Sequence, residues 1–412
     1  MASSRRSVQD VTTAPLPVSA DVRRERLVRV LAAAAFLIFF QAYMVAPLLP
    51  HLAREFGASV QTMGLIVPAY LIPYGVTTLI YGLLSDHVGR RRLLLASMVM
   101  FIALTALTAT STRNLLALAS WRFLTACGAS AVVPLGLVVI GVLFPFERRG
   151  RPLGWLFGAM AGGMAFGSTF GAVLEPFIGW RGLFLGAAIL GALILVALLP
   201  YRDLLGEPTA SAPRVRDVLT GYAGLLRSTR GRSTYAYVLV NAAFHSGIFT
   251  WLGFYFERRF GLGEVGIGLA LLGYGVPGFV FGPVIGRLAD RYGRKRLLPL
   301  GFGIAAVSAA ALAPQIPLPV AALFVTALSL GYDMTQPMLA GIVTSLGGPR
   351  PGLAMGLNVF ALFVGFGLGS LIFGALLPIG LSVALAVFAG VAAVGTLLSI
   401  VLFASESVAP RK

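Results

Sequence analysis

Long apolar runs limit what this chain can fold into more than any other feature of its sequence. Twelve runs are long enough to cross, as helices, a hydrocarbon core about 30 Å thick. They are 28–50, 60–83, 92–110, 115–143, 151–174, 182–200, 235–256, 264–286, 297–314, 317–343, 352–378 and 381–404. With 58% apolar and 11% charged residues, the composition is not that of a soluble globule. The sequence therefore predicts an all-α polytopic membrane protein.

The basic residues fall mostly on one side of these spans. The chain has 32 Lys and Arg against 15 Asp and Glu, and a cytosolic amino terminus places most of the basic residues on cytosolic tails and turns. The opposite side holds only Arg54, Arg113, Arg181, Arg258 and Arg259. Cytosolic loops of membrane proteins carry such an excess. We therefore expect a multi-pass protein of the cell (inner) membrane with both termini cytosolic, and no binding of nucleic acid.

A basic turn occurs twice in the chain, 204 positions apart. The first copy reads Gly82-Leu83-Leu84-Ser85-Asp86-His87-Val88-Gly89-Arg90-Arg91-Arg92. The second reads Gly286-Arg287-Leu288-Ala289-Asp290-Arg291-Tyr292-Gly293-Arg294-Lys295-Arg296. The same shift superposes Tyr70 on Tyr274, and a repeat of this length predicts two copies of one structural unit.

The shared pattern Gly-x-Leu-[Ser/Ala]-Asp-x-x-Gly-Arg-[Arg/Lys] resembles the signature loop of the major facilitator superfamily. The resemblance covers nearly the whole chain. It implies twelve transmembrane helices in two pseudo-symmetric six-helix bundles, a small-molecule substrate bound between them, and rocking of one bundle against the other. It also implies that the turn is a gating motif, in which Asp86 pairs or caps where the two bundles meet.

The polar segments set the expected domain boundaries. Residues 1–25 contain no apolar core followed by a cleavage site, so they are interpreted as a tail and not as a signal peptide. Residues 201–233 form a cytosolic linker in which apolar residues recur at amphipathic spacing. The expected division is 1–25 (tail), 26–200 (first bundle), 201–233 (linker), 234–405 (second bundle) and 406–412 (tail).

Glycines recur along the fifth span. Gly154, Gly163, Gly167 and Gly171 match the spacing of the antiporter signature in exporters of the same superfamily, although Ser168 stands where that signature has proline. Gly179-Trp180-Arg181 resembles the start of the sixth helix in the exporter branch.

Small residues at this spacing let a neighbouring backbone approach closely. The eighth span repeats the spacing at Gly278 and Gly282. We therefore expect the fifth and eighth helices to pack on one another across the two bundles.

Four titratable residues within the spans are candidates for proton coupling. Asp333 is the only carboxylate near the centre of a span, and a charge at that depth must be paired, hydrated or functional. Arg122 resembles the arginine that proton-coupled exporters carry on their fourth helix, and a structural ion pair is its alternative explanation. His245 lies in mid-span, and Glu175 lies near the outer end of the fifth span, where simple solvation is equally plausible.

Uncharged polar residues in the spans are candidates for the substrate cavity, because burying them without a partner costs several kcal/mol. The 204-residue shift places Gln41 on His245, and both fall near mid-membrane. The complete set of cavity candidates is Gln41, Tyr43, Asn241, His245, Tyr332, Gln336 and Asn358.

The leading functional hypothesis is export of small organic compounds, drug-like or metabolite, in exchange for protons, as in the drug:proton antiporter branch. A proton symporter or facilitator that imports a metabolite is the alternative within transport, and a receptor or scaffold that transports nothing is a remote one. An enzyme is not expected. The run Gly261–Gly266 matches G-x-G-x-x-G, but no strand precedes it. We expect no cofactor or metal, and function as a monomer in the lipid bilayer.

Overall fold

The computed structural model describes residues 18–112, 114–145, 148, 150–206, 215–277, 281, 284–285, 288, 291–348 and 351–406. These residues form helices joined by short turns, with no strand among them. The predicted all-α class is confirmed.

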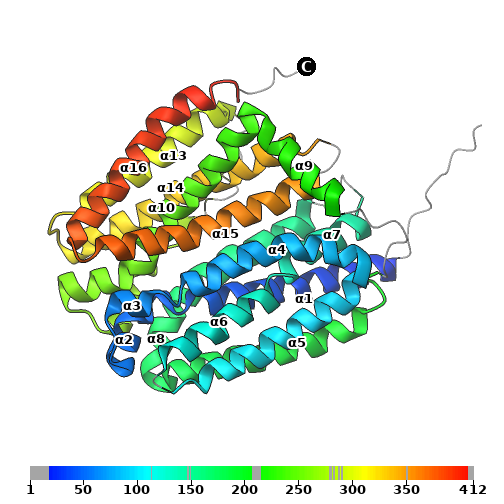
Figure 1. Cartoon of the computed structure of the whole chain (residues 1–412), viewed down its shortest axis with the longest axis horizontal. Coiled ribbons are helices and arrows are strands. Elements are labelled where there is room, and N and C mark those ends of the chain that lie inside the picture. The colour runs from blue at the N-terminus through cyan, green and yellow to red at the C-terminus, as the bar shows by residue number, and fades with distance from the viewer. Residues whose placement is uncertain are drawn as a thin grey trace, which may run out of the picture.

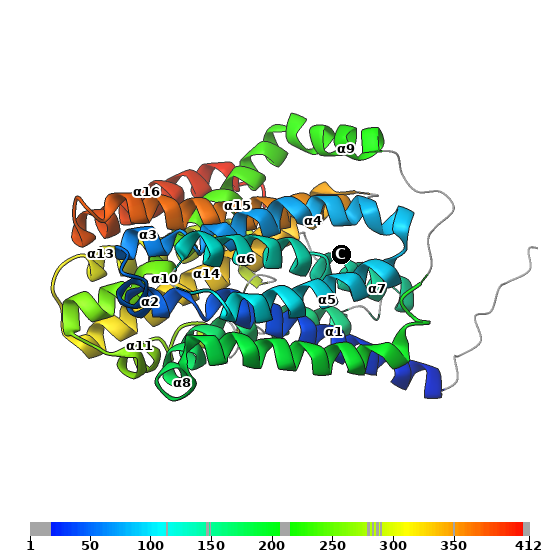
Figure 2. The ribbon, with the colours of Figure 1, turned by 60° about the horizontal axis from the view of Figure 1, so that its bottom comes forward.

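Two groups of helices, which we call the N half and the C half, lie against one another (Figure 1). The N half comprises α1 (Val18–Tyr43), η1 (Ala46–Leu48), α2 (Leu49–Phe56), α3 (Val60–Gly64), α4 (Pro68–Val88), α5 (Arg90–Ala109), α6 (Leu115–Ala129), α7 (Val132–Leu143), α8 (Gly150–Leu198) and η3 (Leu199–Tyr201). The C half comprises α10 (Thr229–Phe260), α11 (Glu264–Ala270), α13 (Arg294–Leu312), α14 (Leu318–Leu346), α15 (Pro351–Leu376) and α16 (Leu381–Leu402). Between them, α9 (Val215–Arg227) lies at the edge of the molecule (Figure 2).

Helix length and hydropathy agree with a membrane protein. Among the described residues, nine helical stretches are long and apolar enough to cross a bilayer. One of them, Arg151–Tyr201, reverses direction at Gly179, where φ is 67° and ψ is 161°, and therefore crosses twice. Helix α10, with 32 residues, is also long enough to cross, and the segment that starts at α11 is described only in part.

The backbone repeats with the period of the sequence. Gly57 and Gly261, 204 positions apart, end α2 and α10 with φ of 63° and 66°. Gly89 and Gly293 precede α5 and α13 with φ of 94° and 78°. Only glycine adopts such φ values without strain, so these pairs fix the same chain reversals in both halves. The internal repeat is therefore also a structural one.

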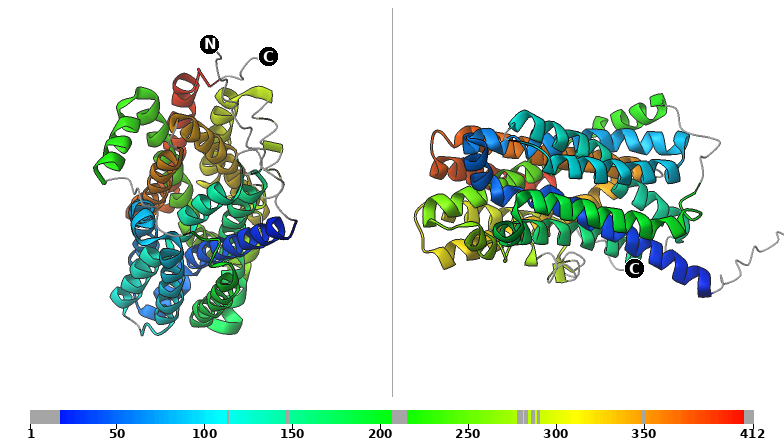
Figure 3. Two further views of the ribbon diagram at one scale, coloured as in Figure 1. Left: turned by 90° about the vertical axis from the view of Figure 1, so that its right-hand side faces the viewer. Right: turned by 90° about the horizontal axis from the view of Figure 1, so that it is seen from below.

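Helix packing follows the same symmetry. In the N half α8 packs against α1 and α5, and in the C half the corresponding pairs are α10 with α15 and α13 with α16. The halves meet along two seams, α4 against α15 and α8 against α11, which the repeat also relates. The view from the end where α1 begins shows the two halves one above the other (Figure 3, left).

Candidate functional site

A buried cation lies inside the N half. Arg122, on α6, is fully buried, and its guanidinium stacks 4.8 Å from the ring centroid of Tyr70. Its Nε donates to the carbonyl of Ile66 at 2.9 Å, and its Nη2 donates to that of Ala42 at 3.2 Å. Both carbonyls lie at helix breaks, Ile66 between α3 and α4 and Ala42 at the end of α1. Arg122 thus binds the backbone at two places where a helix is interrupted: the end of α1, and the break between α3 and α4.

In the corresponding region of the C half, a network of polar side chains takes the place of the buried cation. His245, on α10, stacks on the ring of Tyr332 with centroids 3.7 Å apart. Tyr274, which corresponds to Tyr70, places its hydroxyl 2.7 Å from His245 Nε2. Two of the five residues predicted to be proton-coupling or cavity-lining on α10 and α14, His245 and Tyr332, therefore meet in one cluster with Tyr274.

Asp333 is held at the seam with the segment that follows α11. The hydroxyl of Ser329 donates to Asp333 Oδ2 at 3.1 Å and accepts from the backbone N–H of Gly275 at 2.8 Å. Two residues after Asp333 on α14, Thr335 donates to Asn241 Oδ1 at 3.2 Å, and Asn241 Nδ2 lies 3.5 Å from Gln336 Oε1.

Arg122 and Asp333 form no ion pair in this conformation. The partners of the Arg122 guanidinium all belong to the N half, whereas Asp333 lies on α14 of the C half. A salt bridge between them would therefore have to form in another conformation.

Aromatic side chains fill the space between the halves. Tyr43 contacts the rings of Phe249 and Phe366 with centroids 5.5 and 6.3 Å apart, and Tyr74 stacks on Phe363 at 4.2 Å. Around them lie buried polar atoms that have no hydrogen-bond partner in the described part of the chain. They belong to Gln41, Tyr43, Tyr70, Tyr74 and Asn358, and we call these five residues the buried polar set.

The glycine face of the fifth span packs differently from the expectation. A Cβ built on Gly167 would lie 2.6 Å from the carbonyl oxygen of Phe40, and one on Gly171 2.7 Å from that of Met44. Gly163 faces Phe36 in the same way, whereas Gly154 has open space. Gly163, Gly167 and Gly171 therefore let α8 approach α1 of its own half, and the prediction that this glycine face meets the other half is wrong for these three.

The fifth and eighth helices nevertheless pack together as predicted. Other small residues make that contact, because Gly268 lies against Thr169 and Gly275 against Ala165. The C half repeats the intrahalf arrangement, since Gly365 and Gly369 of α15 face the backbone of α10. Gly278 and Gly282 lie outside the described residues.

The duplicated turn is only partly described. Gly89 and Gly293 start α5 and α13 in matching conformations, which places Arg90 and Arg91 in the first turn of α5. Arg294 Nη1 lies 3.8 Å from Glu406 Oε2. The side chains of Gly82 and Asp86, and the whole of Gly286 and Asp290, lie outside the described part.

Ion pairs differ between the two ends of the molecule. At the end where α1 begins, the pairs between described side chains stay within one half, such as Arg151 with Glu25. There Arg23 hydrogen-bonds Asp203 at 2.7 Å and holds the pKa of that exposed carboxyl below its usual value. At the opposite end, which we call the α2 end, Arg54 binds both Glu257 and Glu264 across the halves.

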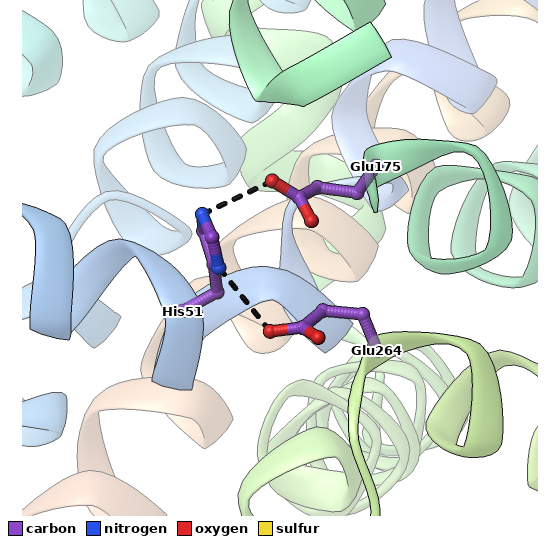
Figure 4. A group of neighbouring side chains, drawn as sticks. All are labelled: His51, Glu175 and Glu264. Atoms are coloured by element: carbon purple, nitrogen blue, oxygen red, sulfur yellow. Dashed lines mark hydrogen bonds and ion pairs between the residues drawn. The ribbon is translucent and has the colours of Figure 1, made fainter. Parts of the chain in front are cut away.

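His51 completes the α2 end. Its Nε2 lies 3.0 Å from Glu175 Oε1 of α8, and its Nδ1 lies 3.2 Å from Glu264 Oε1 of α11 (Figure 4). Glu175 was a candidate from the sequence, whereas His51 and Glu264 were not. No local pattern marks them, because their partners are more than a hundred positions away.

Comparison with known proteins identifies the family. The profile of the Major Facilitator Superfamily matches residues 31–278 and 258–412, almost the entire chain. The chain belongs to this superfamily. It is therefore a multi-pass membrane transporter of small molecules and not an enzyme, as the duplicated turn predicts.

Relatives include exporters. The chain is 25% identical over 336 residues to YwfA, an uncharacterized MFS-type transporter of Bacillus subtilis (strain 168), covering 80% of each chain. It is 27% identical over 264 residues to a chloramphenicol resistance protein of Streptomyces lividans, covering 63% of this chain and 66% of that one. It is 23% identical to citrate exporter 1 of Aspergillus niger, covering 65% of this chain and 57% of that one.

Solved structures agree in fold. The human organic anion transporter MFSD10 (TETRAN) superposes with a TM-score of 0.71 at 18% identity, covering 91% of this chain and 99% of that one. A POT family transporter in complex with a thioalcohol-conjugated peptide superposes with a TM-score of 0.75 at 18% identity, covering 92% and 96%.

Proposed function

We propose that this transporter exports uncharged or amphipathic organic compounds, aromatic ones in particular, in exchange for protons. The observation that carries the proposal is the buried polar set among stacked aromatic rings between the halves. Leaving a buried polar group without a hydrogen bond costs about 1–3 kcal/mol. Groups such as Gln41 and Asn358 are understandable if a substrate or water bonds them during the transport cycle.

The charges near this layer limit the substrate. The guanidinium of Arg122 binds two carbonyls and the Tyr70 ring through Nε, Nη2 and its face, while its Nη1 has no partner in the described part of the chain. Because Arg122 is fully buried within the N half, an anionic substrate between the halves does not reach it in this conformation. Tyr74 and Phe363 stack on one another in this conformation, and planar apolar groups would stack on their faces when the halves separate. Resistance to chloramphenicol among the relatives supports export over import.

Asp333 is the proposed proton carrier. Its carboxyl lies at the C-half side of the seam, bonded through Ser329 to the backbone of Gly275. A change in the charge of Asp333 would therefore strengthen or weaken the contact between α14 and the segment after α11, which packs against α8 of the other half. Glu175 and His245 are the remaining candidates for the proton path.

The proposed topology places both termini in the cytosol and the α2 end outside. The ion pairs that join the halves at the α2 end would then hold the transporter closed to the outside. We propose that a single chain carries out this cycle in the cell membrane, without nucleic acid or cofactor.

Transport in everted membrane vesicles tests the function. An imposed pH gradient, acidic inside the vesicles, should drive uptake of labelled chloramphenicol at a rate that falls when an ionophore collapses the gradient. Labelled citrate serves as the charged comparison. Uptake that does not respond to the gradient would exclude antiport and leave facilitated diffusion, and the absence of flux for a broad panel of neutral compounds would reject the substrate class.

A further inference from the structure

A histidine joins the two halves at the α2 end through both of its ring nitrogens. His51 lies on α2 of the N half, between Glu175 of the same half and Glu264 of the C half (Figure 4). The distances are 3.0 Å from Nε2 to Glu175 Oε1 and 3.2 Å from Nδ1 to Glu264 Oε1. We call these three residues the clasp.

The protonation state of the ring decides whether both contacts are favourable. A neutral imidazole has one N–H and one lone pair, so in either tautomer one carboxylate oxygen would face a lone pair. The imidazolium form has two N–H groups and donates to both carboxylates. Charge-assisted hydrogen bonds of this kind are about twice as strong as neutral ones.

The remaining charged groups at the clasp have partners of their own. Glu55, one turn along α2 and 3.8 Å from His51 Nε2, accepts from Trp180 Nε1 and Arg181 Nη1. These bonds stay within the N half and do not depend on a proton at His51.

Arg54, also on α2, binds Glu257 of α10 and lies 3.0 Å from Glu264 Oε1. Carboxylates therefore outnumber guanidinium groups around His51. The guanidinium of Arg54 keeps its charge between about pH 5 and about pH 8, so the pH-dependent part of the closure rests on the three residues of the clasp.

The clasp can exchange protons with solution. The side chain of His51 is 31% exposed, whereas that of Glu175 is only 7% exposed. Water thus reaches the titrating ring from the α2 end, while one of its acceptors is buried in the N half.

We propose that protonated His51 bridges Glu175 and Glu264, so that proton binding at the clasp stabilises the conformation closed at the α2 end. Loss of the proton removes one bond between the halves and favours opening at this end. The proposal rests on the proposed alternating-access function and adds a second site of proton coupling, separate from Asp333. By linkage, a proton that binds one conformation better shifts the population toward it.

Distance measurements between spin labels on the full-length protein test the clasp. Thr112 and Gln315 are exposed in loops of opposite halves at the α2 end, and each is replaced by cysteine in a Cys127→Ser background. In nanodiscs without substrate and with EDTA, the ratio of short to long distances should rise at least about fivefold from about pH 8 to about pH 5. That is the lower end of what coupled binding events show.

Two substitutions at one position separate charge from shape. In His51→Gln the ratio should be low and independent of pH, because the amide takes up no proton. In His51→Arg it should be high and independent of pH, because the charge is permanent. Glu264→Gln, with His51 intact, should reduce the response by removing the ionised acceptor in the C half.

Three results would overturn the proposal. The first is an unchanged pH response in folded, monodisperse His51→Gln together with an unchanged response in Glu264→Gln. The second is a response that needs added zinc and disappears with EDTA, which would make the clasp a metal site, since histidine and carboxylates also bind zinc. The third is opening at low pH.

The distance measurement contains no substrate, so it tests the clasp separately from the proposed function. If pH-dependent closure is seen but no transport, only the proposed function is rejected. If transport is seen but no pH-dependent closure, only the clasp is rejected.

Discussion

The two halves place a tyrosine at the same point of the repeat and use it for different purposes. In the N half the ring of Tyr70 covers a guanidinium, and its hydroxyl has no partner among the described residues. In the C half the hydroxyl of Tyr274 lies within hydrogen-bonding distance of His245. One scaffold thus surrounds a permanent cation on one side and a titratable ring on the other.

The difference assigns separate tasks to the halves. Arg122 is bonded to carbonyls at helix breaks in α1 and between α3 and α4, so it stabilises the irregular backbone of the N half. The C half places His245, Tyr332 and Asp333 close together on α10 and α14. Apart from the clasp, we therefore expect substitutions of titratable groups to change proton coupling mainly in the C half.

The largest effect is expected for Asp333→Asn. The amide keeps the shape of the side chain but carries no titrating proton, so proton-driven accumulation should fall more than about 100-fold while substrate binding persists. The measurement is uptake and binding in the same vesicles across a pH series. If the variant still concentrates substrate with an unchanged pH profile, the carrier lies elsewhere, and Glu175 is the next candidate.

A large loss of stability is expected for Gly167→Leu. The new side chain would meet the backbone of Phe40, and overpacking of this kind typically costs about 1–3 kcal/mol. Gly369→Leu should behave alike, because it faces the backbone of Ala243 in the C half. Thermal unfolding in detergent measures both.

Gly154→Leu is the matched control for these substitutions, because open space surrounds Gly154. It should unfold at the temperature of the parent protein. A Gly167→Leu protein of normal stability that is trapped in one conformation would instead mean that the glycine face moves during transport.

A smaller effect is expected for the duplicated turn, and it should be unequal. Asp86→Asn should insert and fold but transport poorly, because the motif implies a contact between the halves. Asp290→Asn should be less sensitive, since Arg287 and Arg291 depart from the usual pattern around it. Flux at matched expression measures both, and near-normal flux in Asp86→Asn would reduce the turn to a membrane anchor.

The smallest effects are expected when the two corresponding tyrosines are replaced by phenylalanine. Tyr274→Phe removes the hydroxyl that meets His245, which should cost about 0.5–1.5 kcal/mol and lower transport several-fold. Tyr70→Phe keeps the ring over Arg122 and removes a hydroxyl without a partner in the described chain, so it should be close to neutral. Equal effects in the two halves would contradict the functional difference between them.

Much of the fold follows from the sequence because the bilayer restricts the possible structures. Apolar runs must become helices when no water is present to bond the backbone. The 204-residue repeat then predicts paired units, and glycines such as Gly89 and Gly293 mark the same reversal in each. These inferences need only the local composition of each span and the 204-residue spacing of the repeat.

The candidate site was less predictable, because periodicity does not say which neighbour a helix face meets. Gly163, Gly167 and Gly171 show a face built for close approach, but the partner, α1 rather than the opposite half, depends on how α8 is oriented in the bundle. A structural ion pair was the alternative explanation for Arg122, which instead binds backbone carbonyls that helix breaks expose. A sequence shows that a charge is buried without showing which acceptor lies nearby.

What the sequence by itself determined is therefore the class of molecule: an all-helical, duplicated membrane transporter with titratable groups in its spans. Only the tertiary structure decided which of those groups meet. His51, Glu175 and Glu264 come from three helices of two halves and lie within hydrogen-bonding reach only after the halves pack. The physical reason is that hydrogen bonds act over about 3 Å, and no local pattern encodes contacts between residues so far apart in the chain.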